Sequence, residues 1–295
     1  MRSDQLLPIG ELARLTGVNP VTLRAWERRY GLLKPQRTAK GHRLYPSEQV
    51  ERVKAILAWL QRGASVGQVR DLLDKPAAVA PQGDWQARQA QLIEAIANLS
   101  QRALDQQLNQ AMALYPAITL CEQLLLPLLD SLALRWRSYF NAQLEQVFFH
   151  TWLRSKLGAR VYHDNLLLQG PAVLLADEAG QPFDPGLWLC AWLLTSNGIP
   201  VEVLEQAVSG AQLQRAVSVL QPRALLLHLG PRIDAKALQR TLQGITCVKL
   251  LGGATVPLHR AQLQSFELSE LYLFDSPQAA LRLLQHPEHP PAEMT

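Results

Sequence analysis

The sequence has few of the residues that build several common kinds of site. Its 295 residues include only three cysteines, Cys121, Cys190 and Cys247, which lie too far apart for a metal motif or a disulfide framework. No signal peptide opens the chain, and no apolar run approaches the roughly 20 residues that a membrane span needs. We therefore expect a cytosolic protein with reduced thiols and no membrane partner.

The sequence also lacks the groupings that catalysis needs. It contains no Ser/His/Asp grouping, phosphate-binding loop or zinc motif, and His150 and His163 lie apart on apolar-rich helices. Asp177 and Glu178 follow an expected strand, where open α/β sheets bind ligands, although such a pair more often caps a loop. We expect a protein that is not an enzyme and holds no metal.

Charged residues make up only 18% of the chain, but the positive charge is concentrated in one part. Residues 1–75 hold 14 Lys and Arg against 7 Asp and Glu, whereas the remaining residues hold 15 against 18. A basic excess confined to one segment favours nucleic-acid binding there and a different role downstream.

The basic segment has the pattern of four short helices and a hairpin. Asn19 can cap a second helix, with Pro20 at its first position. Val21, Leu23 and Trp26 should pack inward, which leaves Thr22, Arg24 and Arg28 facing outward. A basic run bounded by Pro35 and Gly41 follows this helix, as expected for the wing of a winged helix-turn-helix.

The rest of the chain changes its pattern twice. Residues 76–83 have the composition of a linker, residues 84–168 that of a helical bundle, and residues 287–295 that of a disordered tail. Between residues 169 and 286 short apolar strands alternate with helices; the strands are expected at 172–176, 201–204, 224–229, 247–251 and 270–274. We predict a multidomain α and α/β protein: a winged helix-turn-helix at 1–75, the bundle, and a doubly wound, mostly parallel sheet.

The motifs of the first segment resemble the MerR family of transcriptional regulators over residues 7–73. The matching elements are Thr22-Leu23-Arg24 on the recognition helix, Gly31-Leu32 before the wing and Arg43-Leu44-Tyr45 on the closing strand. Ala25-Trp26 replaces the family's frequent tyrosine pair, a variant typical of the subgroup of light-sensing cobalamin repressors and MlrA-like regulators. The resemblance implies a DNA-binding set: Thr22, Arg24, Arg28, Tyr30, Arg37, Lys40, His42, Arg43 and Tyr45.

The second half resembles the cobalamin-binding regulatory half of those repressors. In the family, the turn after the first strand carries an acidic residue, then a cobalt-ligating His, then a Gly. Aligned on Gly186, these positions hold Gln181 and Phe183 in this chain. Because phenylalanine has no lone pair for a metal, we expect no cobalamin bound in the family's manner.

Other family positions are only partly kept. Trp136 is present in the bundle with Glu145 near the expected register, but the histidine that should follow the glutamate is absent. The paired glycines survive as Gly252 and Gly253, where they would let a ligand or a helix approach the backbone. His228 stands where the family's third strand ends in Ser.

The resulting hypothesis is a MerR-family regulator that binds a palindromic promoter site as a dimer. The resemblance makes RNA polymerase at that promoter a further partner, with activation or repression left open. The regulatory domain would have lost cobalamin. The alternative is a sensor of light or of a small molecule, which for light would need bound cobalamin.

Overall fold

The computed structural model describes residues 6–38, 41–61, 64–73, 84–137, 140, 142–178, 180, 182–253 and 255–285. It divides into two compact units, residues 1–149 and 150–295, with the division inside one long helix. The predicted linker 76–83, the predicted tail 287–295, Lys40 and Gln181 lie outside the described residues. The domain boundaries given above stay a prediction.

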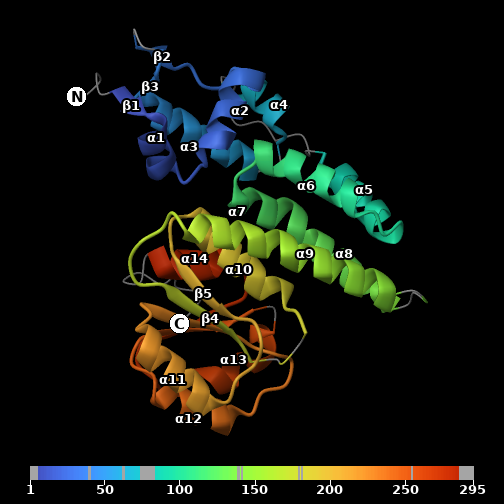
Figure 1. Ribbon diagram of the computed structural model, residues 1–295, viewed down its shortest axis with the longest axis vertical. Helices are drawn as coiled ribbons and strands as arrows, with labels where there is room; N and C mark the ends of the chain where they lie inside the picture. Colours follow the sequence, from blue (N-terminus) through green and yellow to red (C-terminus); the bar gives the residue numbers. More distant parts are fainter. Residues whose placement is uncertain are drawn as a thin grey trace. The chain divides into compact units, whose positions relative to one another are not determined.

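The first unit begins with a small helical domain and its wing (Figure 1). Its helices are α1 (Ile9–Thr16), α2 (Pro20–Tyr30), α3 (Glu48–Gln61) and α4 (Val66–Leu72). Its strands are β1 (Leu6–Pro8), β2 (Gln36–Arg37) and β3 (Arg43–Pro46), which pair antiparallel in the order β1-β3-β2. The hairpin β2–β3 is the predicted wing, whereas β1 was not predicted, because three residues carry no strand pattern of their own.

A helical bundle completes the first unit. It contains α5 (Trp85–Ala97), α6 (Gln101–Leu114), α7 (Ala117–Leu120), the π-helical η1 (Cys121–Leu125), α8 (Leu126–Trp136) and the start of α9 (Ala142–Asn165). Apolar side chains such as Leu92, Leu108 and Leu128 fill its core. The amide of Gln89 on α5 donates to Pro127 O at 2.9 Å and Ser131 Oγ at 2.6 Å, which ties α5 to α8.

The bundle corrects one expectation from the sequence. The helical run Ala117–Trp136 has 20 residues and contains an 18-residue window with a mean hydropathy of 1.5, so by length and composition it could span a membrane. The statement that no apolar run approaches that length is therefore wrong. Leu120, Leu124, Leu128 and Leu132 are buried in the bundle, so one side of this run belongs to its core, although only 39% of the apolar window is buried.

The second unit is built around a five-stranded parallel sheet. The strands are β4 (Val173–Asp177), β5 (Val201–Leu204), β6 (Ala224–His228), β7 (Val248–Gly252) and β8 (Leu271–Phe274), in the order β5-β4-β6-β7-β8. β4 and β6 are fully buried, as the continuous apolar runs predicted. The predicted doubly wound sheet is confirmed, and its strand order changes direction between β4 and β6.

Helices cover both faces of this sheet (Figure 1). α10 (Pro185–Ser196) and α14 (Pro277–Gln285) pack together on one face. α11 (Gly210–Leu220), α12 (Ala235–Gln243) and α13 (Val256–Gln264) lie on the other. Asp184 begins α10 by accepting the backbone N–H groups of Gly186 and Leu187 at 2.7 and 3.2 Å. The carboxyl ends of β4, β6 and β7 thus meet the start of α10.

A substitution at Gly252 would test how closely β7 packs against the neighbouring strand β8. A Cβ at this position would lie 2.1 Å from the carbonyl oxygen of Phe274 on β8, so backbone would have to move. We expect Gly252→Ala to lower the free energy of unfolding by about 1–3 kcal/mol, measured by urea denaturation. Gly158→Ala is the control: its Cβ would meet Trp188 at an ordinary 3.6 Å, and helix propensity should raise stability by about 0.5–1 kcal/mol. Equal effects would contradict this account.

Candidate nucleic-acid interface and regulatory site

The recognition helix α2 presents a basic face to solvent. Asn19 Oδ1 accepts the backbone N–H of Val21 at 2.8 Å, and Gly31, at φ 62°, ends the helix in the left-handed conformation. Arg24 and Arg28, one helical turn apart, are exposed, and so is Arg29. The structure thus keeps two of the predicted contact residues together on one free face.

Two positions at the start of α2 differ from the prediction. Val21, expected in the core, is 57% exposed, whereas Thr22, expected to face outward, is only 2% exposed. Thr22 lies one turn before Trp26 and shares its side of the helix. Helices α1, α4 and α6 all pack against α2, so several elements compete to decide which side of it is buried.

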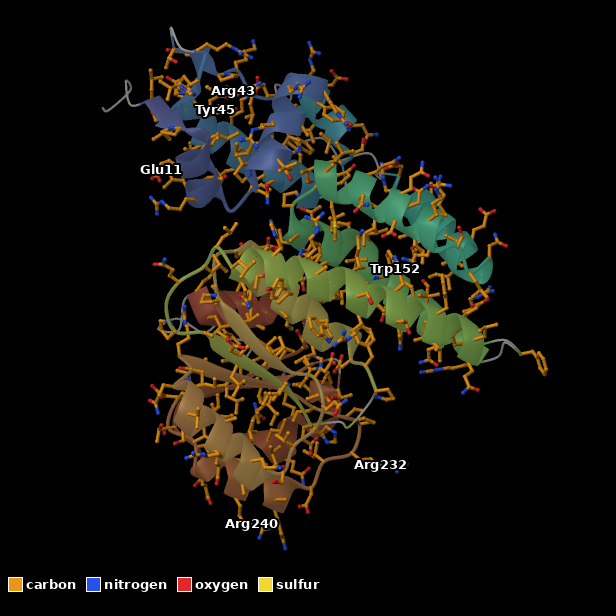
Figure 2. The ribbon with its side chains drawn as sticks, viewed as in Figure 1. Glu11, Arg43, Tyr45, Trp152, Arg232 and Arg240 are labelled. Atoms are coloured by element: carbon orange, nitrogen blue, oxygen red, sulfur yellow. The ribbon has the colours of Figure 1, made fainter. Side chains whose placement is uncertain are left out.

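Glu27 joins the recognition helix to the wing. Its Oε2 accepts a hydrogen bond from Arg43 Nε at 2.7 Å and one from the Tyr45 hydroxyl at 3.2 Å. Arg43 and Tyr45 lie close together on β3 (Figure 2). Burial, and then the Glu27 carboxylate, raise the pKa of Tyr45 to about 12. Glu27 was not predicted, although it is the only acidic residue in α2.

This cluster changes the roles expected for two residues. Tyr45 is fully buried, so its side chain is not available for contact from outside. Arg43 is half-buried and directs its guanidinium at Glu27. Both residues therefore hold β3 against α2; Tyr45 is a positioning residue, whereas the predicted DNA contact of Arg43 stays a prediction, since its side chain is 27% exposed.

The wing presents further cations. Arg37 on β2 is exposed and lies directly opposite Arg43 on β3. Two like charges in such a cross-strand pair repel, and Glu27 offsets the charge on one of them. His42 is exposed next to Gly41, whose φ of 79° shapes the turn. Tyr30, in contrast, is half-buried beside Gly67 of α4.

Trp26 anchors α2 to the bundle. Its side chain is fully buried, and Nε1 donates to the carbonyl oxygen of Leu114, at the end of α6, at 2.7 Å. The predicted inward packing of Trp26 is confirmed. The hydrogen bond connects residues far apart in the sequence and has no sequence signal.

The loop after β4 carries Phe183 at the position that the resemblance assigns to a cobalt ligand. Its ring packs against His150 of α9, with the ring centroids 5.2 Å apart. Burial lowers the pKa of His150, which favours the neutral imidazole. The two rings form an aromatic contact at this edge of the sheet.

A buried pair lies next to this contact, between β4 and β7. His228, at the end of β6, is 6% exposed, and its Nδ1 is hydrogen-bonded to Asp184 Oδ2. Burial is the largest single influence on the pKa of Asp184 and raises it, but the hydrogen bond and charge of His228, with the backbone N–H groups of Leu187 and Gly186, together hold the pKa below its usual value. A Cβ at Gly186 or at Gly253 would lie 2.6 Å from Cε1 of His228. The two glycines therefore face the imidazole ring.

The bundle positions named by the resemblance also meet. Trp136 Nε1 donates to Glu145 Oε2 at 3.2 Å, and Arg135 donates to both Glu145 oxygens at 2.9 and 2.8 Å. Glu145 is 3% exposed, and the hydrogen bond from Arg135 holds its pKa below the usual value. Both oxygens of this carboxylate are thus engaged by neighbours on α8.

Asp177 and Glu178 line a cavity of about 160 Å³ at the carboxyl edge of the sheet, with Leu213, Leu227 and Thr241. Asp177 Oδ2 accepts the N–H of Gly180 at 2.8 Å, in agreement with loop capping. Burial raises the pKa of Glu178. Within the described residues, no group of three or more His, Cys, Asp or Glu side chains is placed to hold a metal ion.

Comparison with known proteins matches two segments of the chain to family models. Residues 7–75 match a family model described as "MerR HTH family regulatory protein", and residues 88–160 match one described as "B12 binding domain". The chain is 32% identical to the "HTH-type transcriptional regulator MlrA" of Escherichia coli, over 80% of this chain and 93% of that protein. It is 29% identical to the "HTH-type transcriptional repressor CarH" of Myxococcus xanthus, over 75% and 77%. A solved cobalamin-binding protein from Desulfitobacterium hafniense aligns with 68% of this chain and 97% of its own, at 17% identity and a TM-score of 0.35.

The hydrogen bond from Trp26 predicts a difference between two tryptophans. Trp26→Phe leaves the buried carbonyl of Leu114 without this donor, which should cost about 1–3 kcal/mol of unfolding free energy. Trp85→Phe is the matched control, because Trp85 Nε1 is buried without a hydrogen-bond partner among the described residues. We expect the control to cost clearly less in urea denaturation. A larger loss for Trp85→Phe would refute the anchoring role of Trp26.

Proposed function

The chain belongs to the MerR family of transcriptional regulators and is a DNA-binding regulator, and we propose that it binds a two-fold promoter site as a homodimer. RNA polymerase at that promoter is the proposed further partner, and a promoter as target implies the cytoplasm. We assign no catalytic role to any residue, in keeping with relatives that are transcriptional regulators.

The exposed face of α2 supports the proposed contacts with DNA. Arg24 and Arg28 are exposed on the helix, and within the described part of the chain neither forms an ion pair with a carboxylate, so both are available to base edges or phosphates. Arg37 and His42 extend this basic surface onto the wing, where phosphate contacts fix position rather than sequence. Lys40 belongs to the proposed set from its place in the sequence alone.

Glu27 also supports the proposal, because it fixes the position of the wing relative to the recognition helix α2. Its hydrogen bonds with Arg43 and Tyr45 fix β3 relative to α2 before any DNA is bound. A preorganised surface loses less conformational entropy on binding. One recognition helix reads only a few base pairs, so a second copy on a two-fold site supplies the remaining affinity and specificity.

Two substitutions distinguish contacts with base edges, which give sequence specificity, from contacts with phosphates, which do not. Arg24→Ala should weaken binding to the operator by about tenfold or more, because a good contact to a base edge is worth about 1–3 kcal/mol. Arg37→Ala should weaken binding to all sequences alike and reduce the salt dependence of log K by about one unit. Footprinting locates the operator, and fluorescence anisotropy at several salt concentrations measures both effects.

Arg102→Ala provides the control for these measurements, because Arg102 is an exposed cation on α6 of the bundle. It should leave affinity and salt dependence unchanged. A protected region without two-fold symmetry would contradict binding as a dimer. An Arg24→Ala variant that binds as tightly as the parent would contradict the role of α2.

We further infer that the regulatory domain works without bound cobalamin. Phe183 offers no lone pair to cobalt and is packed against His150. The glycines Gly186 and Gly253 face the ring of His228 instead of open space. These residues do not fit the group in the manner that the family resemblance implies.

Direct uptake tests this inference. The purified protein is incubated with adenosylcobalamin in the dark, separated by gel filtration and examined for cobalamin absorbance. We expect none to be retained, whereas the Desulfitobacterium hafniense cobalamin-binding protein retains it as a positive control. Stoichiometric retention by this chain would refute the inference and favour the alternative, a cobalamin-dependent light sensor.

A further inference from the structure

Three segments of the second unit converge on the side chain of His228. Asp184 follows β4, His228 ends β6, and Gly253 follows β7, so all three lie at the carboxyl edge of the sheet. Gly186, in the first turn of α10, completes the enclosure. In open α/β folds this edge, next to the point where the strand order reverses, is where ligands bind.

The imidazole ring fills the space that the two glycines leave. A Cβ at Gly253 would lie 2.6 Å from Cε1 and 2.8 Å from Nε2 of His228, and a Cβ at Gly186 would lie 2.6 and 3.2 Å from the same atoms. No side chain larger than hydrogen is compatible with the ring at either position without a shift. Because neither glycine has a side chain, the space beside them is available to the imidazole ring of His228.

Asp184 holds the ring in this place. Its Oδ1 caps α10, and its Oδ2 is hydrogen-bonded to Nδ1 of His228. Both oxygens of a buried carboxylate are thus satisfied, as such a group requires. The ring also lies against Phe274 of β8, with the centroids 5.9 Å apart.

We propose that His228, held by Asp184, is a built-in occupant of the space between Gly186 and Gly253, and that this filled space, more than the missing ligand at Phe183, excludes cobalamin. The proposal rests on the inferred absence of cobalamin from this domain. A missing ligand removes one bond to cobalt, whereas an occupied space removes the room for part of the molecule. The two causes, the missing ligand at Phe183 and the space filled by His228, predict different cobalamin binding when each residue is substituted.

Chemical rescue tests, without the use of cobalamin, whether the ring of His228 fills an enclosed space. His228→Ala leaves a cavity of the shape of an imidazole, with the Asp184 carboxylate as acceptor, so the melting temperature should fall. Added imidazole or benzimidazole should restore part of it, with an affinity for this variant at least about tenfold higher than for the parent protein. His228→Asn, which keeps a donor toward Asp184, serves if the alanine variant does not fold and should show weaker rescue.

His163→Ala is the matched control for the rescue. His163 is an exposed histidine on α9 of the same unit, so its removal leaves no enclosed space, and neither heterocycle should raise the melting temperature. Equal stabilisation of this control and of the His228 variants would overturn the proposal. So would the absence of any rescue of folded His228→Ala or, where that variant does not fold, of folded His228→Asn.

Cobalamin uptake distinguishes the two causes. We expect no retention of adenosylcobalamin by the parent or by Phe183→His, and retention by the double variant Phe183→His/His228→Ser. Retention by Phe183→His alone would overturn the filled space as the cause and leave the proposed function intact. Retention by the parent protein would refute the inferred absence of cobalamin itself. No retention by a folded double variant would show that His228 is not the deciding obstacle.

Discussion

The carboxyl edge of the sheet in the second unit is organised by one largely buried carboxylate, Asp184, whose side chain is 18% exposed and both of whose oxygens have partners. One oxygen begins α10, and the other holds the imidazole at the end of β6. Because a buried charge without partners is costly, this requirement ties the β4–α10 turn to the centre of the sheet. The glycines beside the ring follow from the same arrangement, since a side chain at either would collide with it.

A second carboxylate, Glu27, has a comparable effect in the DNA-binding domain. It connects the recognition helix to the strand of the wing through Arg43 and Tyr45. The family motif that ends in Tyr45 is thereby explained in physical terms as a support for the surface. The residues that remain free for DNA are cations on the outer side of α2 and on the wing, such as Arg24 and Arg37.

Much of the fold could be predicted because its signals are local. Apolar runs bounded by turns located all five strands of the parallel sheet to within about one residue, and Asn19 marked the start of α2. The burial of Thr22 and the exposure of Val21 were not predicted, because they depend on which elements pack against α2, and one of these, α6, comes from a distant part of the chain. Helix periodicity states which residues share a side, not what covers that side.

The sequence by itself determined the order of the domains, the position of the basic surface and the absence of a ligand atom at Phe183, because these follow from residue type and spacing. Only the tertiary structure decided which residues of the motif are buried, that Trp26 donates to Leu114, and that His228 fills the space beside Gly186 and Gly253. Those features join atoms that lie far apart along the chain. Their distances are set by packing between elements, which no local pattern records.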